Sequence, residues 1–299
     1  MADIALRFHK DMLTLSGSVS AALDRLGVDT EHDLEFMNLV EPDTVQNILR
    51  MEKAAGAQCL VLGTAHMTPA QLAQRGFEGR AFELSVAAFT VVGSLRPQHV
   101  LVELGPCGLP LDGSDKNSLN EHRAQYAEAA RVFEKSEFDA YFLNQFTDLT
   151  SLKCALMGLH QVSDKPIFCS VEVDAAGNLP KKGTLAQAVL TMEEFGASVV
   201  GFSSKAPVDE LVVLAKEAVS GTELPVLVQV DVVERNPKQG ASTPENPYYC
   251  ADTMEQVAPK LRAAGVQFLR AVGAATPAYT GALAISTSGF DVVPARFQR

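Results

Sequence analysis

The sequence has little that would suit a nucleic acid, a membrane or a secretory signal. Its 25 Lys and Arg against 36 Asp and Glu give a net charge of -11, and no run of basic residues could follow a phosphate backbone. No stretch approaches the roughly 18 consecutive apolar residues of a membrane span. Residues 1–10 are too charged for a signal peptide. We therefore expect a cytoplasmic protein that binds neither nucleic acid nor membranes.

Disulfides and familiar local motifs are missing as well. The five cysteines are odd in number, widely separated and never in a CxxC pair, which argues for reduced thiols and against a disulfide framework or zinc knuckle. GxGxxG, Walker A, HExxH and GxSxG are absent. The closest approaches are Gly105-Pro106-Cys107-Gly108 and Leu15-Ser16-Gly17-Ser18, and neither has the required spacing. Function therefore has to be inferred from the fold.

What the 299 residues do contain is a repeated strand and helix pattern, with 47% hydrophobic residues to form a core. Eight short aliphatic runs are nearly continuous in hydrophobicity, as in strands covered on both faces. This pattern predicts one α/β domain over residues 1–299, a single (β/α)8 TIM barrel. The alternative is an open doubly wound sheet. The eight runs are residues 12–18, 58–64, 99–105, 140–146, 167–174, 198–204, 226–232 and 267–273.

Helices and long connections are expected between the strands. Amphipathic helices are predicted at residues 43–55, 124–135 and 208–219. Glycines such as Gly56 and Gly196 come just before strands, as in helix C-caps. Long connections follow strand C-termini, where barrel enzymes build their sites. They are residues 65–80, 106–121 and 234–249.

The barrel predicts that polar residues at the strand ends converge at one mouth, although about half of them face elsewhere because strand side chains alternate. Glu172 and Asp174 are expected to point the same way, either as a carboxylate pair for an amine or a proton, or in salt bridges with Arg270 or Lys205. The converging residues are Ser16, Ser18, Thr64, His66, Glu103, Cys107, Asn144, Gln145, Asp148, Glu172, Asp174, Ser203, Ser204, Lys205, Gln229, Asp231 and Arg270.

His66 and Cys107 lie at adjacent predicted strand ends and allow three interpretations. They could be two metal ligands, or Cys107 could be a nucleophile activated by the imidazole. The interpretation we favour is a loop histidine and a half-buried thiol, because no third ligand or spacing signature accompanies them.

Segments along nearly the whole chain resemble a known family in order and spacing. They are Leu15-Ser16-Gly17-Ser18-Val19, residues 37–45, 54–57, 104–108, 146–155 and 201–211, and Val272-Gly273-Ala274-Ala275-Thr276-Pro277. Together they resemble the homocysteine S-methyltransferase family, which includes betaine-homocysteine methyltransferase and the N-terminal barrel of cobalamin-dependent methionine synthase. The resemblance implies a barrel methyltransferase.

The departures from the family pattern concern its zinc site. The resemblance implies zinc held by three thiolates, but Ser204, Ala274 and Ala275 stand at those positions. A serine hydroxyl is a poor zinc ligand and a methyl group is none. Asn144 replaces an expected acidic residue, and Ser16 an opening aspartate. We therefore predict no metal or other cofactor. In the family's chemistry zinc activates the acceptor thiol by lowering its pKa from about 8.5, and that activation would be missing here.

The sequence thus predicts a methyltransferase of this type, acting on a small molecule at the barrel mouth, either zinc-independent or with an altered methyl acceptor. The alternatives are a non-catalytic binding or regulatory subunit, for example the partner of a separate corrinoid protein, and unrelated chemistry on the same barrel. Self-association into a homo-oligomer is also an expectation. The catalytic candidates are Glu172, Asp231 and Arg270; the substrate-binding candidates are Ser16, Gly17, His66, Cys107, Asn144, Gln145, Asp148, Ser203 and Ser204.

Overall fold

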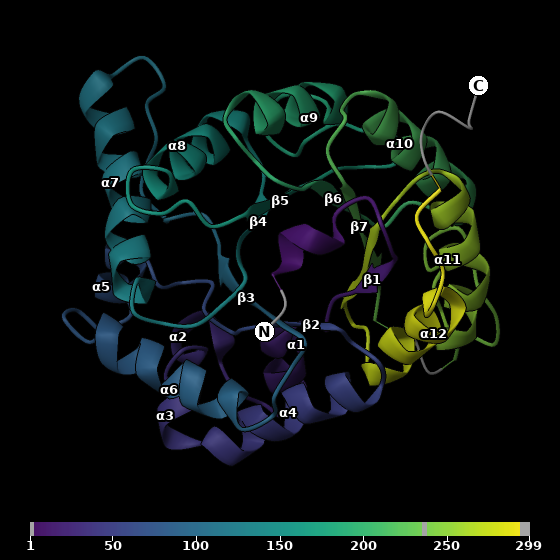
Figure 1. Ribbon diagram of the computed structural model, residues 1–299, viewed down its shortest axis with the longest axis horizontal. Coiled ribbons are helices and arrows are strands. Elements are labelled where there is room, and N and C mark those ends of the chain that lie inside the picture. Colours follow the sequence, from purple (N-terminus) through teal and green to yellow (C-terminus); the bar gives the residue numbers. More distant parts are fainter. Residues whose placement is uncertain (1–2, 235–237, 294–299) are drawn as a thin grey trace.

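Eight parallel strands form the centre of the molecule in a computed structural model that describes residues 3–234 and 238–293 (Figure 1). The strand order is β1-β8-β7-β6-β5-β4-β3-β2, and a bridge from Leu15 to Cys59 joins β1 to β2. The sheet is thereby closed, which confirms the predicted (β/α)8 barrel and excludes the open sheet. The strands are β1 Leu13–Thr14, β2 Cys59–Val61, β3 His99–Leu104, β4 Ala140–Phe146, β5 Ile167–Glu172, β6 Val200–Ser204, β7 Val226–Val232 and β8 Phe268–Gly273.

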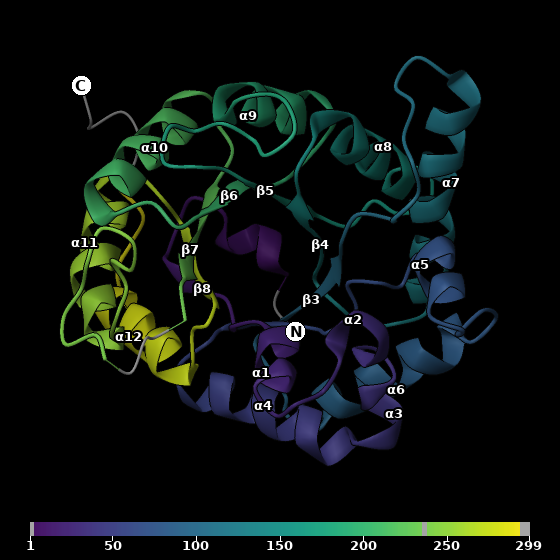
Figure 2. The same cartoon turned by 180° about the vertical axis from the view of Figure 1, so that it is seen from behind.

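Helices surround the barrel on its outside, as Figures 1 and 2 show from opposite sides, apart from the short N-terminal helix, which lies across one end. Within the described ranges, no helix is both long enough and apolar enough to span a bilayer. The helices are η1 Ile4–Arg7, α1 Val19–Asp24, α2 Thr30–Asp33, α3 Met37–Val40, α4 Pro42–Ala54, α5 Pro69–Gln74, α6 Ala81–Gly93, α7 Lys116–Phe133, α8 Leu149–Leu159, α9 Leu185–Glu194, α10 Val208–Ser220, η2 Ala251–Thr253, α11 Met254–Ala263 and α12 Pro277–Thr287.

Two of the three long connections contain more helix than the sequence predicted. The connection at 65–80 includes α5, and α7 begins at Lys116, inside the expected loop and before the helix predicted from residue 124. The Asp115 side chain explains the early start of α7, because it accepts hydrogen bonds from the backbone N–H groups of Asn117 and Ser118. Of the connection at 234–249, residues 235–237 lie outside the described part of the chain.

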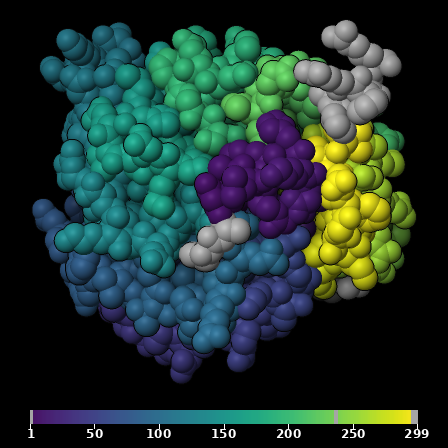
Figure 3. All heavy atoms as spheres, in the orientation of Figure 1, coloured from purple at the N-terminus to yellow at the C-terminus, as the bar shows by residue number. Residues whose placement is uncertain are grey.

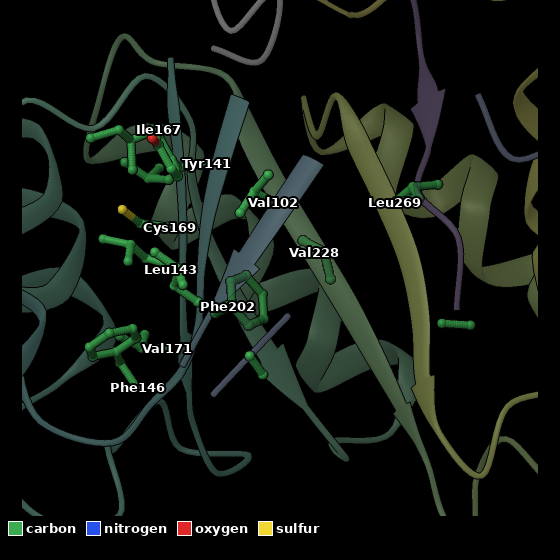
Figure 4. Packing of buried hydrophobic residues seen from close by; sticks show 14 of the residues in the cluster. Val102, Tyr141, Leu143, Phe146, Ile167, Cys169, Val171, Phe202, Val228 and Leu269 are labelled. Carbon is green, nitrogen blue, oxygen red and sulfur yellow. The ribbon is translucent and has the colours of Figure 1, made fainter. Parts of the chain in front are cut away.

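The strands are hydrophobic on both sides because they separate two apolar layers. Leu101, Phe142, Phe168 and Phe268 belong to the inner layer along the barrel axis. Their strand neighbours belong to the larger outer cluster that packs against the helices, part of which Figure 4 shows. Alternation of side chains thus fills both layers, as the near-continuous hydrophobic runs predicted.

The N-terminal segment closes the end of the barrel opposite the strand carboxyl ends. Ile4 is fully buried, and the Phe8 ring packs edge-on against Phe168 and Phe268. The Gln267 side chain holds this segment by accepting from the His9 N–H at 2.8 Å and donating to the Arg7 carbonyl at 2.7 Å. Figure 3 shows the segment in purple near the centre of this face. A ligand therefore has to enter at the carboxyl ends of the strands.

Candidate active site at the barrel mouth

A polar cavity of about 170 Å³ lies at the carboxyl ends of the strands. Strands β3 to β8 each contribute one or more of its lining residues, which is the arrangement by which TIM barrels assemble a site from distant parts of a chain. We call this cavity the mouth. Its lining residues are Ser18, Ser20, Ala21, Glu103, Asn144, Gln145, Glu172, Ser203, Gln229, Asp231, Arg270, Val272 and Gly273.

Arg270 anchors the floor of the mouth. Its side chain is 1% exposed, and its guanidinium donates from Nε to the Ser16 carbonyl at 2.8 Å and from Nη2 to the Gly17 carbonyl at 3.3 Å. Nη1 donates to Gln229 Oε1 at 3.1 Å, and Nη2 lies 3.7 Å from Glu103 Oε2. Burial lowers the pKa of Arg270, and the Glu103 carboxylate opposes that effect. The guanidinium is therefore a fixed positive charge at the barrel axis.

A chain of amide hydrogen bonds continues from Arg270 across the floor. Gln229 Nε2 donates to Asn144 Oδ1 at 2.8 Å and to Ser170 Oγ at 2.7 Å. Asn144 Nδ2 donates in turn to Glu103 Oε1 at 2.6 Å. Because each of these buried groups orients the next, the floor is rigid before any ligand arrives.

Gln145 lies in a local distortion of β4. Its φ of 62° is in the left-handed region that L residues other than glycine rarely adopt. The pairing of β4 with β5 also shifts register between Leu143 and Phe146. Gln145 is exposed between buried neighbours and lines the mouth. Backbone strain of this kind is concentrated at functional sites, where the surrounding structure maintains it.

Glu172 and Asp231 are the two carboxylates of the mouth with perturbed protonation. Burial raises the pKa of Glu172, and the negative charge of Asp231 raises it further. Burial also raises the pKa of Asp231, whereas Lys205, with its Nζ 3.8 Å from Asp231 Oδ2, opposes that shift. Carboxylates that hold a proton more tightly than usual, in a cavity, are candidates for proton transfer.

The expected pairing of Glu172 with Asp174 is wrong. Asp174 Oδ1 accepts hydrogen bonds from the backbone N–H groups of Ala176 and Asn178, which draws the side chain into an exposed turn. These hydrogen bonds lower the pKa of Asp174, in contrast to Glu172. The strand ends at Glu172, so the two-residue alternation no longer applies at position 174.

His66 and Cys107 are held by different partners instead of by each other. His66 lies beside Glu35, with Nδ1 3.4 Å from Glu35 Oε2. Cys107 is buried, with Sγ 3.3 Å from His122 Nδ1, and lines a separate cavity of about 380 Å³. Burial raises the pKa of the Cys107 thiol, which disfavours the thiolate that a nucleophile needs.

The remaining predicted residues divide between the mouth and its supports. Ser203 lines the mouth, whereas Asp148 caps α8 by accepting from the Ser151 N–H at 2.8 Å and lines the cavity of Cys107. The Ser16 hydroxyl accepts from the Val61 N–H at 2.9 Å, and the Ser204 hydroxyl from the Ala206 N–H at 3.2 Å. These serines thus hold backbone at the strand ends.

Sequence reasoning missed Glu52, a buried support on α4. Its Oε2 accepts from the Gly17 N–H at 2.8 Å and from the Thr280 hydroxyl at 2.6 Å. A Cβ on Gly17 would lie 3.0 Å from Glu52 Oε1, so glycine permits this close approach. A glutamate within an amphipathic helix is normally predicted to face solvent, and no local sequence pattern indicates that Glu52 is buried.

Comparison with known proteins shows the family of the chain. The family model for homocysteine S-methyltransferase matches residues 13–278, which is most of the sequence. The chain belongs to the homocysteine S-methyltransferase family. Among curated protein sequences none matches this chain.

Several solved structures share the fold of this chain. The metallated form of the homocysteine methyltransferase MmuM from Escherichia coli has a TM-score of 0.75 at 16% identity, over 93% of this chain and 96% of that one. Its oxidized form has a TM-score of 0.76, again at 16% identity and with the same coverage. The carboxyl transferase domain Y628A of Rhizobium etli pyruvate carboxylase, with pyruvate, reaches 0.52 at 12% identity, over 88% of this chain and 40% of that one.

The positions that the sequence resemblance assigns to the zinc ligands of the homocysteine S-methyltransferase family do not fit a zinc ion here. Ser204 is 2% exposed and its hydroxyl already accepts from the Ala206 N–H, and Ala274 and Ala275 offer only methyl groups. Elsewhere in residues 3–234 and 238–293, no group of three or more His, Cys, Asp or Glu side chains could hold a metal. A structural or catalytic zinc needs at least three such donors.

Proposed function

We propose that this family member is a small-molecule methyltransferase that reacts at the mouth without a metal-bound thiolate. The observation that carries the proposal is the pair formed by Glu172 and Asp231, whose pKa values burial raises in a cavity that also contains Arg270. A carboxylate with a raised pKa is a stronger base than an ordinary one. It can therefore supply part of the acceptor activation that zinc would otherwise provide.

The roles follow from the positions of the groups. Glu172 or Asp231 takes the proton of the acceptor as the acceptor attacks the methyl carbon, and the donor leaves with the electrons of its former bond to that carbon. The donor is a small sulfonium or ammonium compound, because three carboxylates, Glu103, Glu172 and Asp231, line the mouth against one Arg270. Arg270 and the amide chain hold Glu103 at the floor of the mouth.

Turnover experiments test this assignment. The protein is incubated with homocysteine and either S-methylmethionine or betaine, and methionine is measured. We expect Glu172→Gln and Asp231→Asn each to lower kcat/KM by about 10²- to 10⁴-fold, the usual range for loss of a general base. Asp174→Asn is the matched control, since that carboxylate lies in the exposed turn. Equal rates in all three variants would assign the base elsewhere.

A binding or regulatory subunit is the second candidate function, and the serine and two alanines at the zinc positions favour it. Such a protein would bind ligands at the mouth without converting them, or dock a separate corrinoid protein there. Absence of methionine with both donors, together with binding of homocysteine in calorimetry, would support this candidate. Turnover lost in Glu172→Gln would exclude it.

Metal content provides an independent measurement. We expect purified protein to hold less than about a tenth of an equivalent of zinc after incubation with zinc and desalting, because a three-donor set is missing at the family positions. Mass spectrometry of the metals in the protein gives the ratio. One equivalent of zinc that survives desalting would contradict the zinc-independent mechanism.

A further inference from the structure

A second cavity, of about 240 Å³, adjoins the mouth through three shared lining residues: Ser20, Glu103 and Gln145. We call it the side chamber. Helices α1 and α2 and the connection that follows β2 provide most of its remaining wall. A substrate whose reacting atom lies near Glu172 can therefore extend into it. Its lining residues are Val19, Ser20, Asp24, Asp29, Thr30, Glu31, Leu34, Gly63, Ala65, His66, Glu103 and Gln145.

The side chamber is lined by charges of one sign. Asp24, Asp29, Glu31 and Glu103 contribute four carboxylates, and no lysine or arginine is among its lining residues. Three of these carboxylates have partners of their own. Asp24 Oδ1 accepts from the Thr30 hydroxyl, and Asp29 lies 3.0 Å from His32 Nδ1. Glu103 accepts from Asn144 and lies 3.7 Å from Arg270 on the mouth side. A carboxylate or phosphate group of a ligand would find no cation here, whereas a cation is favoured.

A buried carboxylate fixes the histidine of the side chamber. Glu35 is 1% exposed, and its Oε1 accepts from the His66 backbone N–H at 2.7 Å. Glu35 Oε2 and His66 Nδ1 are both buried, 3.4 Å apart, and neither makes a hydrogen bond. A carboxylate facing one ring nitrogen selects the tautomer with the proton on that nitrogen. The Nδ1–H form of His66 is thereby favoured.

The orientation of His66 decides what it offers a ligand. Since Nδ1 is buried against Glu35, the exposed fifth of the side chain includes the opposite edge, which carries Nε2. In the Nδ1–H tautomer, Nε2 is a hydrogen-bond acceptor. An acceptor nitrogen among carboxylates matches a group that is both cationic and a donor, which in a small molecule is a protonated amine.

We propose that the side chamber binds a protonated amine of the substrate, and that Glu35 acts as a positioning residue that holds His66 Nε2 toward that amine. The inference rests on the proposed function, because it names the chemistry of a second part of the same substrate. The amine donates to His66 Nε2 and lies in the field of the four carboxylates. Binding a donor at Nε2 polarises the ring and strengthens the Nδ1–H contact with Glu35, as catalytic hydrogen bonds tighten on ligand binding.

Ligand-observed NMR with two isosteric probes tests the chamber directly. We expect n-butylamine to bind the full-length protein near neutral pH at least about tenfold more tightly than 1-butanol, which has the same shape without the charge. His66→Gln should weaken butylamine binding about tenfold. His32→Gln is the matched control, because His32 is an exposed histidine near the same rim, and it should change binding by less than about twofold.

The positioning role of Glu35 needs a spectroscopic readout. In protein labelled with ¹⁵N-histidine, the ring shifts of His66, assigned by their loss in His66→Gln, should show the Nδ1–H tautomer. Glu35→Gln should change that tautomer ratio and weaken butylamine binding. Should either variant fail to give a native melting curve, Glu31→Gln on the exposed rim should still weaken butylamine binding about twofold.

Failure of the chamber and failure of the proposed reaction are distinguishable. Glu172→Gln and Asp231→Asn should lower kcat/KM for methyl transfer by about 10²- to 10⁴-fold and leave butylamine binding within about twofold of wild type. Equal binding of butylamine and butanol, wild-type affinity in His66→Gln, or an Nε2–H tautomer would each overturn the chamber inference. Butylamine binding that depends on His66 supports it even where no methionine is formed.

Discussion

At the residue scale, Asp231 is subject to two opposite effects. Burial at the end of β7 raises its pKa, and Lys205 opposes the shift from 3.8 Å. Since the net direction is upward, the folded state binds a proton more tightly than the unfolded state. The contribution of Asp231 to stability is therefore most favourable below the ordinary aspartate pKa and is lost as the pH rises through the folded pKa.

Asp231→Asn should accordingly raise the melting temperature at neutral pH. The gain should fade as the pH falls through the raised pKa of the folded state and be gone by about 3.9, the ordinary aspartate value. Asp174→Asn should do the opposite at neutral pH, because hydrogen bonds lower the pKa of Asp174 and its stabilising effect is lost only as the pH falls. Thermal melts of both variants over a pH series measure this. A pH-independent loss of stability in Asp231→Asn would contradict it.

Buried hydrogen bonds to Glu52 give a second residue-scale effect. Thr280→Val removes the hydroxyl that donates to Glu52 Oε2 with little change of shape. Hydrogen bonds to charged groups contribute about 1.5–3 kcal/mol, so we expect that loss in the free energy of unfolding. Urea denaturation measures it. An unchanged midpoint would show that the Gly17 N–H alone satisfies the carboxylate.

At the element scale, the hydrophobic runs predicted all eight strands, and β4 and β7 have the predicted bounds. Helix starts were less predictable, because α7 begins in a polar segment where only the Asp115 cap marks it. The positive φ of Gln145 could not be predicted from the local sequence, since glutamine is not a residue that favours positive φ. Alternation alone would have assigned its side chain to a different face.

A substitution of Asp148 distinguishes a helix-capping role of this residue from a role in ligand binding. Asp148→Ala removes the acceptor for the Ser151 N–H at the start of α8, which should cost about 1 kcal/mol of unfolding free energy. Butylamine binding should stay within about twofold of wild type, as expected for a residue that does not line the side chamber. Chemical denaturation and the NMR titration measure the two effects. Large loss of binding at unchanged stability would instead favour the predicted substrate role of Asp148.

At the scale of the whole molecule, the barrel is closed where strands β1 and β2 meet, and its end is filled by the N-terminal segment. The Ser16 N–H donates to the Cys59 carbonyl at 2.8 Å across the β1–β2 seam. Ile4 fills the opposite end and is fully buried in the inner layer. The pairing of β1 with β8 brings Arg270 within reach of the Ser16 and Gly17 carbonyls, so the floor of the mouth joins the first and the last strand of the barrel.

Ile4→Ala should lower the free energy of unfolding by about 2–5 kcal/mol, the usual cost of a large truncation in a packed core. Leu6→Ala is the matched control in the same short helix, because Leu6 is 62% exposed, and it should change stability by less than about 0.5 kcal/mol. Denaturant titration compares the two variants. Similar losses in both would mean that the segment unfolds without affecting the barrel.

The sequence by itself determined the number of strands, the two apolar layers and the polar strand ends, because each depends on the local alternation of side chains. The tertiary structure alone decided the partners: Glu172 with Asp231, His66 with Glu35, and Cys107 with His122. Glu35, Glu52 and His122 lie outside the strand ends on which the sequence prediction relied. Their contacts form because barrel closure and helix packing bring distant segments together, and no short-range pattern encodes that approach.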